Sequence, residues 1–291
     1  MKIQFMGTAA AEGAPALFCT CAHCRYARAR GGREIRSRAG SIVDGRLKLD
    51  FGPDSFKQML DCGVDYTNLR TVLITHSHDD HLLPTDLAYR REGYGHFAPD
   101  DVPLTVYGNE AVGEALRPHL NPRLRFERIR PFEPTEIDGY RVTALDAVHC
   151  VQSDSDRYPV TAADGKALHR SEEALFYLIE RGGESLLYAH DTDEFTPRDM
   201  EFLAGRKLDL ISMDCTNGVQ DCDYYGHMGI NDNLRMREKL LANGAADAHT
   251  IFVSNHFSHN GLAPYEDLCR RLPGFRVSYD GMTLNTKGEK L

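Results

Sequence analysis

The sequence lacks any long hydrophobic run. No stretch of its 291 residues approaches the roughly 18 consecutive apolar residues that a membrane-spanning helix requires. The first six residues, MKIQFM, are typical of a short strand that ends at Gly7, and they lack the apolar core and cleavage site of a signal peptide. We therefore expect a cytoplasmic protein with no membrane-bound role.

The sequence also lacks an excess of positive charge. It has 34 Lys and Arg residues against 43 Asp and Glu residues, a formal net charge of -9, and no repeat or long charge run. Proteins that bind nucleic acids or acidic membranes through charge carry a basic field. Nucleic acid is therefore a weak candidate as a partner, and a small molecule is a stronger one.

Short apolar runs alternate with helical patterns, which indicates an α/β protein with more strands than helices. The expected strands span residues 41–49, 71–74, 104–107, 141–144, 175–179, 185–189, 208–213, 250–253 and 276–279. The expected helices span residues 53–62, 109–116, 197–204, 231–243 and 264–272. We expect a single domain over residues 1–291, with a polar loop or hairpin inserted at about 152–171.

Three imidazoles and two carboxylates lie within the seven residues THSHDDH, which run from Thr75 to His81 directly after an expected strand. Neutral imidazole suits zinc, iron and similar ions, and a carboxylate among imidazoles suits a second or harder ion. So short a loop cannot direct all of these groups at one ion, which indicates two adjacent metal sites. Further ligands must come from later strand ends, where the candidates are His149, Asp191 and His256.

This pattern resembles the metallo-β-lactamase superfamily, whose motif His-x-His-x-Asp-His matches His76, His78, Asp80 and His81 without a gap. The resemblance implies an αββα sandwich of two mixed β-sheets flanked by helices, with the site at one sheet edge. It also implies two divalent metal ions, Zn, Mn or Fe, that generate hydroxide for hydrolysis, with Asp80 orienting the hydroxide. The implied ligands are His76, His78 and His149 for one ion, Asp80, His81 and His256 for the other, and Asp191 as the bridge.

His190 departs from the superfamily pattern, because relatives often carry a small residue directly before the bridging Asp. We expect His190 to pack or to orient a ligand. The alternative is that His190 is itself a ligand, in which case Asp191 loses its assigned role.

Three of the eight cysteines cluster in the run CTCAHC, as Cys19, Cys21 and Cys24. Such a cluster in a cytosolic chain is more often metal-binding than oxidised, and a closed zinc site needs a fourth ligand. His259 can supply it, and His23 is an alternative with more awkward geometry. The cysteine spacing, with His259 three residues after His256, resembles the bacterial phosphoribosyl cyclic-phosphate phosphodiesterases of phosphonate breakdown. We expect one structural zinc here; free thiols and a surface histidine are the alternative.

Hydrolysis of an ester also needs an acid to protonate the leaving alkoxide. The best candidate for this acid, or for a phosphate contact, is His227 in the run GHMGIN, because it precedes an expected helix whose dipole favours anions. Phosphodiesterase relatives carry a Gly-His pair in a comparable place, and a helix-capping histidine is the alternative. The segment 25–38 is locally basic, so its arginines are candidate phosphate contacts as well as a solvated surface run.

Together these features favour a metal-dependent hydrolase, and foremost a phosphodiesterase acting on a small phosphate ester such as a cyclic ribose phosphate. One alternative is another hydrolase of the same fold, namely a thioesterase, a lactonase or an RNA-processing nuclease. Others are an iron protein like those of pyrroloquinoline quinone biosynthesis, and a non-catalytic metal-binding protein. The expected partner is a small phosphorylated substrate, and a homodimer, common in this superfamily, stays open.

Overall fold

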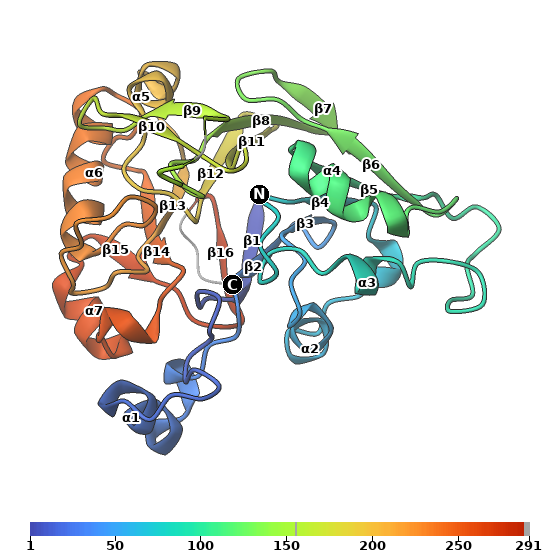
Figure 1. Cartoon of the computed structure of the whole chain (residues 1–291), viewed down its shortest axis with the longest axis horizontal. Coiled ribbons are helices and arrows are strands. Elements are labelled where there is room, and N and C mark those ends of the chain that lie inside the picture. The colour runs from blue at the N-terminus through green and yellow to red at the C-terminus, as the bar shows by residue number, and fades with distance from the viewer. Residues whose placement is uncertain (155, 288–291) are drawn as a thin grey trace.

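Two seven-stranded β-sheets pack face to face, and helices cover their outer faces (Figure 1). The structure is a computed structural model that describes residues 1–154 and 156–287. This arrangement is the αββα sandwich of two mixed sheets that the sequence predicts. Within the described residues, no helix has the length and apolar character needed to cross a membrane.

The first sheet is antiparallel at one end and parallel at the other. Neighbouring strands are antiparallel from β16 (Met282–Asn285) to β3 (Leu47–Leu49) and parallel from β3 to β6 (Leu124–Arg128). Helices α2 (Ser55–Asp61), α3 (Pro84–Leu87) and α4 (Glu110–Leu116) lie along its outer side (Figure 1). In order across the sheet, its strands are β16 (Met282–Asn285), β1 (Lys2–Gly7), β2 (Gly40–Val43), β3 (Leu47–Leu49), β4 (Thr71–Leu73), β5 (Leu104–Gly108) and β6 (Leu124–Arg128).

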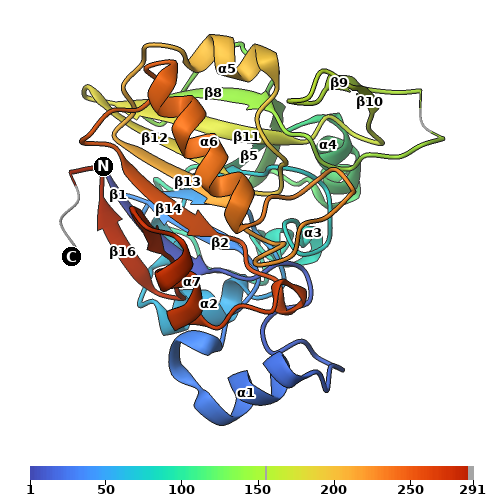
Figure 2. The same ribbon diagram turned by 90° about the vertical axis from the view of Figure 1, so that its left-hand side faces the viewer.

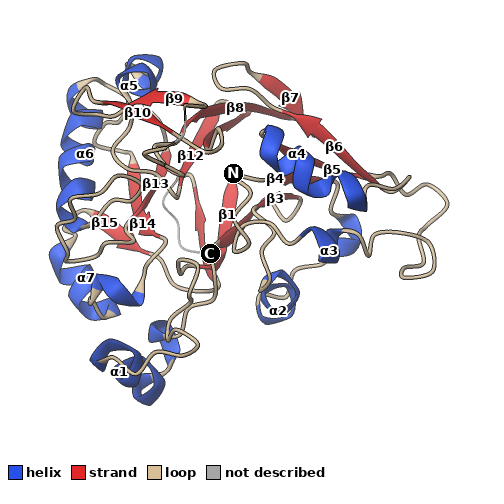
Figure 3. Cartoon of the chain, in the orientation of Figure 1, coloured by secondary structure: helices blue, strands red, loops and turns tan. Residues whose placement is uncertain are grey.

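The second sheet is also parallel at one end and antiparallel at the other. Neighbouring strands are parallel from β15 (Phe275–Val277) to β12 (Glu184–Ala189) and antiparallel from β12 to β7 (Thr135–Ile137). Helices α5 (Pro197–Leu203), α6 (Ile230–Ala242) and α7 (Tyr265–Arg271) lie on its outer side, opposite the helices of the first sheet (Figure 3). In order across the sheet, its strands are β15 (Phe275–Val277), β14 (Ile251–Asn255), β13 (Leu210–Asp214), β12 (Glu184–Ala189), β11 (Leu175–Arg181), β8 (Tyr140–Asp146) and β7 (Thr135–Ile137).

The sequence of strand β11 is a continuous apolar run, and the burial of both faces of the strand explains it. Its side chains alternate between faces, as they do in any strand. Tyr177 and Ile179 point into the core between the sheets, whereas Phe176 and Leu178 join the core beneath the helices of the second sheet. Because both faces of the strand are buried, neither set of alternate positions is polar.

Two expected elements differ in detail from the structure. The expected strand 41–49 is two strands, β2 and β3, because Asp44 and Gly45 both have positive φ, 50° and 71°. A two-residue turn of this kind matches the twist of a β-hairpin. The expected insertion at 152–171 contains a hairpin of β9 (Pro159–Thr161) and β10 (Ala167–His169), and its position 155 lies outside the described residues.

Several elements were not expected. Helix α1 (Ala22–Arg30) covers part of the cysteine segment and extends away from the sandwich (Figure 2). It has no apolar stripe, since only Cys24 and Ala27 of its residues are buried. The sheet-edge strands β6, β7 and β16 and the four-residue helix α3 were also missed.

Candidate metal centre

The predicted ligands come from four strands whose carboxyl ends meet at one edge of the sandwich. His76 follows β4 of the first sheet, and the other strands, β8, β12 and β14, belong to the second sheet. Crevices at the carboxyl ends of strands are common ligand sites in α/β proteins. The structure brings all seven predicted ligands together here: His76, His78, Asp80, His81, His149, Asp191 and His256.

One group of ligand atoms lies around His78. Its Nδ1 atom is 2.9 Å from Nε2 of His76 and 3.4 Å from Nε2 of His149. Cys150 is the fourth member of this group, with Sγ 3.7 Å from Nε2 of His78, and Oδ1 of Asp191 lies 3.6 Å from Nε2 of His149. Ligand bonds of about 2.0–2.2 Å place neighbouring ligand atoms roughly 3 Å apart, so this spacing suits one shared ion.

The second group lies around the other oxygen of Asp191. Its Oδ2 atom is 2.8 Å from Nε2 of His81 and 2.9 Å from Nε2 of His256. Asp80 contributes Oδ2, 3.1 Å from Nε2 of His81. Asp191 therefore directs one oxygen at each group, which is the geometry of a carboxylate that bridges two ions.

The chemistry of the second group fits a cation. Nε2 of His81, Oδ2 of Asp191 and Nε2 of His256 are buried and lie within 2.9 Å as N–O pairs, yet none of them makes a well-directed hydrogen bond in the described structure. Burial disfavours the charged imidazole of His256, but the carboxylates of Asp191 and Asp214 together outweigh burial and raise the pKa of His256 to about 10. Positive charge is thus favoured between these groups, and a divalent ion would supply it while satisfying all three atoms.

In the first group, by contrast, burial keeps the imidazoles of His76 and His149 neutral. Burial lowers the pKa of His149 to about 4 and lowers that of His76 well below its usual value. A neutral ring presents the lone pair that a metal ligand needs. The two groups together are consistent with a dinuclear metal site.

The outward-facing ring nitrogens of four ligands have partners that fix the ring orientation. Such outer contacts set both the tautomer and the basicity of a metal-binding histidine. The pairs are His76 Nδ1 with Thr75 Oγ1 (3.0 Å), His81 Nδ1 with Asp50 Oδ2 (2.9 Å), His149 Nδ1 with the Gly226 carbonyl (3.1 Å) and His256 Nδ1 with Thr216 Oγ1 (2.8 Å).

The backbone is strained at this edge. Asp50, Asp191 and His256 all have left-handed backbones, with φ of 58°, 51° and 61°. For non-glycine residues such conformations cost about 1–3 kcal/mol each and cluster at functional sites. Gly52 has a different role, because a Cβ atom there would lie 1.8 Å from the carbonyl oxygen of Asp80.

His227 lies beside the second group, on the segment between β13 and α6. Its Nδ1 atom is 3.1 Å from Oδ2 of Asp214 and 3.9 Å from Oδ1 of Asp191. Burial disfavours the imidazolium, but the carboxylates of Asp214 and Asp191 together outweigh burial and raise the pKa of His227. A protonated imidazole beside the ligand cluster can donate a proton to a leaving group.

Asp214 was not among the predicted site residues, although it follows the expected strand 208–213 directly. It is fully buried, and it accepts hydrogen bonds from the backbone N–H groups of Asp191, Thr216 and Met228. It therefore fixes the loops of Asp191 and His227 relative to each other. Asp50, the partner of His81, was missed in the same way.

The three clustered cysteines and His259 form a separate group below the sandwich. Nδ1 of His259 lies 3.6 Å from Sγ of Cys19 and 3.7 Å from Sγ of Cys21, and all four ligand atoms lie within 4.8 Å of one another. Each sulfur accepts a backbone N–H: Cys19 from Cys21, Cys21 from Cys24, and Cys24 from Ala16. The backbone N–H of Cys24, together with His259, lowers the pKa of Cys21 to about 6, which favours a thiolate. A tetrahedral zinc ion would fit this set, and His23 is not part of it.

The structure places His190 away from both groups of ligand atoms. Its Nε2 atom lies 2.8 Å from Oγ of Ser212, and its ring centroid is 3.9 Å from that of Tyr188. Burial lowers the pKa of His190 to about 3, so the ring is neutral. His190 thus packs inside the second sheet.

The arginines of segment 25–38 do not line the cavity at the ligand cluster, which does not support the phosphate contact that the sequence offered beside a surface run. Arg28 donates to the carbonyl oxygens of Cys19 and Ala16, at 2.8 and 3.0 Å. Arg36 is buried and donates to Thr8 and Ser278, and Arg38 pairs with Asp54. These guanidinium groups hold the amino-terminal segment together instead of lining the cavity.

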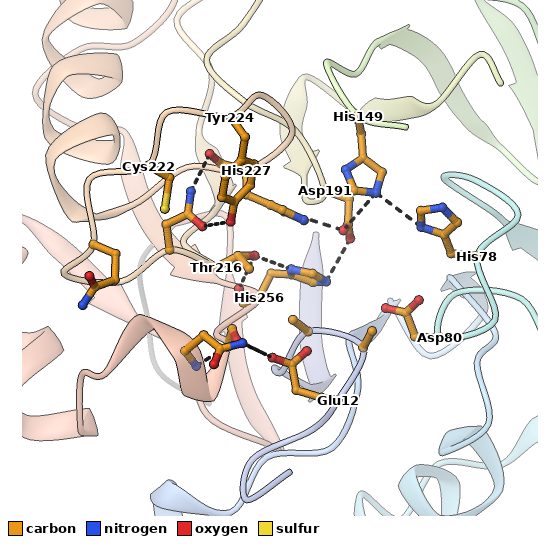
Figure 4. Close-up of a pocket in the computed structure, with 16 residues that line it drawn as sticks. Glu12, His78, Asp80, His149, Asp191, Thr216, Cys222, Tyr224, His227 and His256 are labelled. Atoms are coloured by element: carbon orange, nitrogen blue, oxygen red, sulfur yellow. Dashed lines mark hydrogen bonds and ion pairs between the residues drawn. The ribbon is translucent and has the colours of Figure 1, made fainter. Parts of the chain in front are cut away.

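A cavity of about 460 Å³ opens directly above the ligand cluster. Figure 4 shows His78, Asp80, His149, Asp191, His227 and His256 on its floor, with Tyr224 and Glu12 on opposite sides. This volume is typical of a site for a small molecule.

A family model described as the beta-lactamase superfamily domain matches residues 46–249, which include every predicted ligand of the two groups except His256. The chain belongs to the metallo-β-lactamase superfamily.

Two kinds of curated relative resemble this superfamily member. The coenzyme PQQ synthesis protein B of Methylobacterium radiotolerans is 24% identical over 98% of this chain and 100% of that protein. The ribonuclease Z of Listeria innocua is 29% identical over 53% of this chain and 47% of that protein, so this match spans about half of the nuclease.

Solved structures agree on the fold. A structure described as a new diphosphatase from the PhnP family has a TM-score of 0.70 and 21% identity, covering 100% of this chain and 99% of that one. Zn(2+)-bound PqqB from Methylobacterium extorquens has a TM-score of 0.73 and 21% identity, covering 98% and 100%. Fold, family and site together identify a metal-dependent hydrolase of this superfamily.

Proposed function

We propose that this protein is a phosphodiesterase that hydrolyses small phosphate esters, with two divalent metal ions held by His76, His78, His149, Asp80, His81, His256 and the bridging Asp191. The observation that carries the proposal is the position of His227, with Nδ1 3.9 Å from the bridging carboxylate and 3.1 Å from Asp214. Two ions in such a site generate hydroxide at neutral pH and neutralise charge that develops on phosphoryl oxygens.

The residues around the ions have distinct tasks in this proposal. Asp80 orients the attacking group, and His227 donates a proton to the leaving alkoxide. Asp214 holds His227 in place and favours its protonated form. An acid is most useful when the leaving group is a poor one, as the alkoxide of a phosphate ester is, so the arrangement supports hydrolysis of an ester with an alkoxide leaving group.

A role like that of coenzyme PQQ synthesis protein B is the second candidate, because the likeness to that protein covers 98% of this chain. An iron-dependent oxidation would distinguish it from hydrolysis. The cysteine group, proposed as a structural zinc site, does not separate the two candidates. The cytoplasmic location and the preference for a small molecule over nucleic acid as partner stay predictions, and the homodimer stays open.

The direct test is hydrolysis of bis-p-nitrophenyl phosphate by purified protein supplied with manganese, zinc or iron. We expect metal-dependent turnover that Asp80→Ala abolishes. Asp79→Ala is the matched control, because Asp79 is the exposed neighbour and belongs to neither group of ligand atoms. Absence of turnover with every metal, together with iron-dependent oxygen uptake, would favour the second candidate.

A further inference from the structure

The outer wall of the cavity combines polar and apolar surface and, among the described residues, carries no lysine or arginine side chain. Beyond the ligand cluster the wall presents amides, hydroxyls and one carboxylate beside the smaller side chains of Ala10, Ala11, Thr216 and Cys222. The polar groups come from Asn217, Gln220, Tyr224, Ser258, Asn260 and Glu12. Proteins that bind a phosphate away from a metal commonly use arginine or lysine, so this wall is not built for a second phosphate.

Several of these wall groups are held in place. Tyr224 donates through its hydroxyl to Oδ1 of Asn217 (2.6 Å), and Asn217 donates through Nδ2 to the carbonyl oxygen of His227 (3.0 Å). Figure 4 shows this chain of contacts running from Tyr224 to the segment that carries His227. The polar wall is thus attached to the segment of the proposed acid.

Glu12 is the charged member of the wall, and one of its oxygens is already engaged. Its Oε1 atom accepts a hydrogen bond from Oγ of Ser258 and one from Nδ2 of Asn260 at 3.5 Å, and it faces Nε2 of His259 at 3.5 Å. None of these contacts involves Oε2. The side chain of Glu12 remains 31% exposed, so a molecule in the cavity can reach it.

The contact with His259 fixes Glu12 to the cysteine group, because the other ring nitrogen of His259 faces Cys19 and Cys21. A carboxylate behind a metal-binding histidine is a common way to orient both groups. A carboxylate so placed accepts hydrogen bonds from hydroxyl groups and repels a phosphate.

We infer that the substrate is a phosphodiester of an uncharged, hydroxyl-bearing group, such as a nucleoside or free sugar, and that it carries no second phosphate. This inference rests on the proposed phosphodiesterase function. The diester lies at the two groups of metal ligands, and the uncharged remainder lies against Tyr224, Asn217 and Glu12. Glu12 determines specificity by accepting hydroxyl protons and excluding additional anionic groups.

The test uses two substrates that differ only in one phosphate, adenosine 2′,3′-cyclic phosphate and its 5′-phosphorylated form. The ratio of their kcat/KM values is measured for the native protein and for Glu12→Gln and Glu12→Lys. Glu133→Lys is the control for the same change of charge, because Glu133 is exposed and does not line the cavity. Turnover of bis-p-nitrophenyl phosphate is measured in parallel.

We expect the native protein to favour the substrate without the 5′-phosphate by at least about tenfold. Glu12→Lys should reduce this ratio by about tenfold, mainly through a lower KM for the phosphorylated substrate, and Glu12→Gln should fall between. Glu133→Lys should leave the ratio unchanged. The inference is overturned, while the proposed function stands, if bis-p-nitrophenyl phosphate is hydrolysed but the substrate without the 5′-phosphate is not preferred. The same holds if Glu12→Lys behaves like Glu133→Lys. If none of the three substrates is hydrolysed, the proposed function falls and the inference falls with it.

Discussion

Replacing His227 with alanine should slow hydrolysis according to the leaving group. The side chain of His227 is only 19% exposed, and its Nδ1 atom is 3.9 Å from Asp191. In this proposal His227 is the acid and is not a metal ligand. General acid catalysis contributes about 10²–10⁴-fold. We expect His227→Ala to lose that factor in kcat/KM with adenosine 2′,3′-cyclic phosphate, whose leaving group is an alkoxide. With bis-p-nitrophenyl phosphate the loss should stay within about fivefold, because p-nitrophenolate leaves without a proton.

The pH dependence of kcat/KM tests the role of His227 independently. Burial alone would lower the pKa of His227, and the carboxylates of Asp214 and, to a smaller extent, Asp191 reverse this and raise it. An acid acts only while protonated, so kcat/KM for the alkoxide substrate should fall as pH rises through the pKa of His227. Asp214→Asn removes the carboxylate and should therefore move this fall in kcat/KM to lower pH. Equal losses of kcat/KM with both substrates in His227→Ala would refute the acid role. So would an Asp214→Asn variant in which kcat/KM falls at the same pH as in the native protein.

Three further predictions address the residues around the site. Asp50→Asn removes the carboxylate behind His81 and should weaken metal binding by about 10–100-fold in a chelator competition; unchanged affinity would count against it. His190→Phe leaves the hydroxyl of Ser212 unpaired, so denaturation should show a loss of about 1–3 kcal/mol with metal content unchanged; a loss of metal would instead make His190 a ligand. Cys21→Ser should remove one metal ion per chain and lower Tm, while turnover of bis-p-nitrophenyl phosphate stays within about threefold; an unchanged metal content would exclude the cysteine site.

The sequence predicts the central elements well, because they are buried and therefore strongly patterned. All five expected helices are present, and the apolar run at 175–179 is strand β11. Ligands could be anticipated at His149, Asp191 and His256 because each follows such a strand, and parallel strands direct their carboxyl ends to the same edge. The edge strands β6 and β16 escaped because short, half-exposed strands have weak patterns.

Residues that act through other residues were harder to anticipate. Asp214 and Asp50 each stand alone at a strand end, and only their contacts with His227 and His81 reveal their roles. Helix α1 escaped because it has no apolar stripe. The sequence offered phosphate contact and a surface run as alternatives for the arginines near it, because sequence alone does not show that Arg28 bonds to nearby backbone carbonyls.

The most direct test of the dinuclear site is a metal titration of metal-free protein, followed by turnover of bis-p-nitrophenyl phosphate at each step. The Cys21→Ser variant is used so that the cysteine group takes up no ion. The account predicts that activity reaches its maximum at two ions per chain and that Asp191→Ala, which lacks the bridging carboxylate, stays inactive at every ratio. Full activity with one ion per chain, or turnover without added metal, would contradict it.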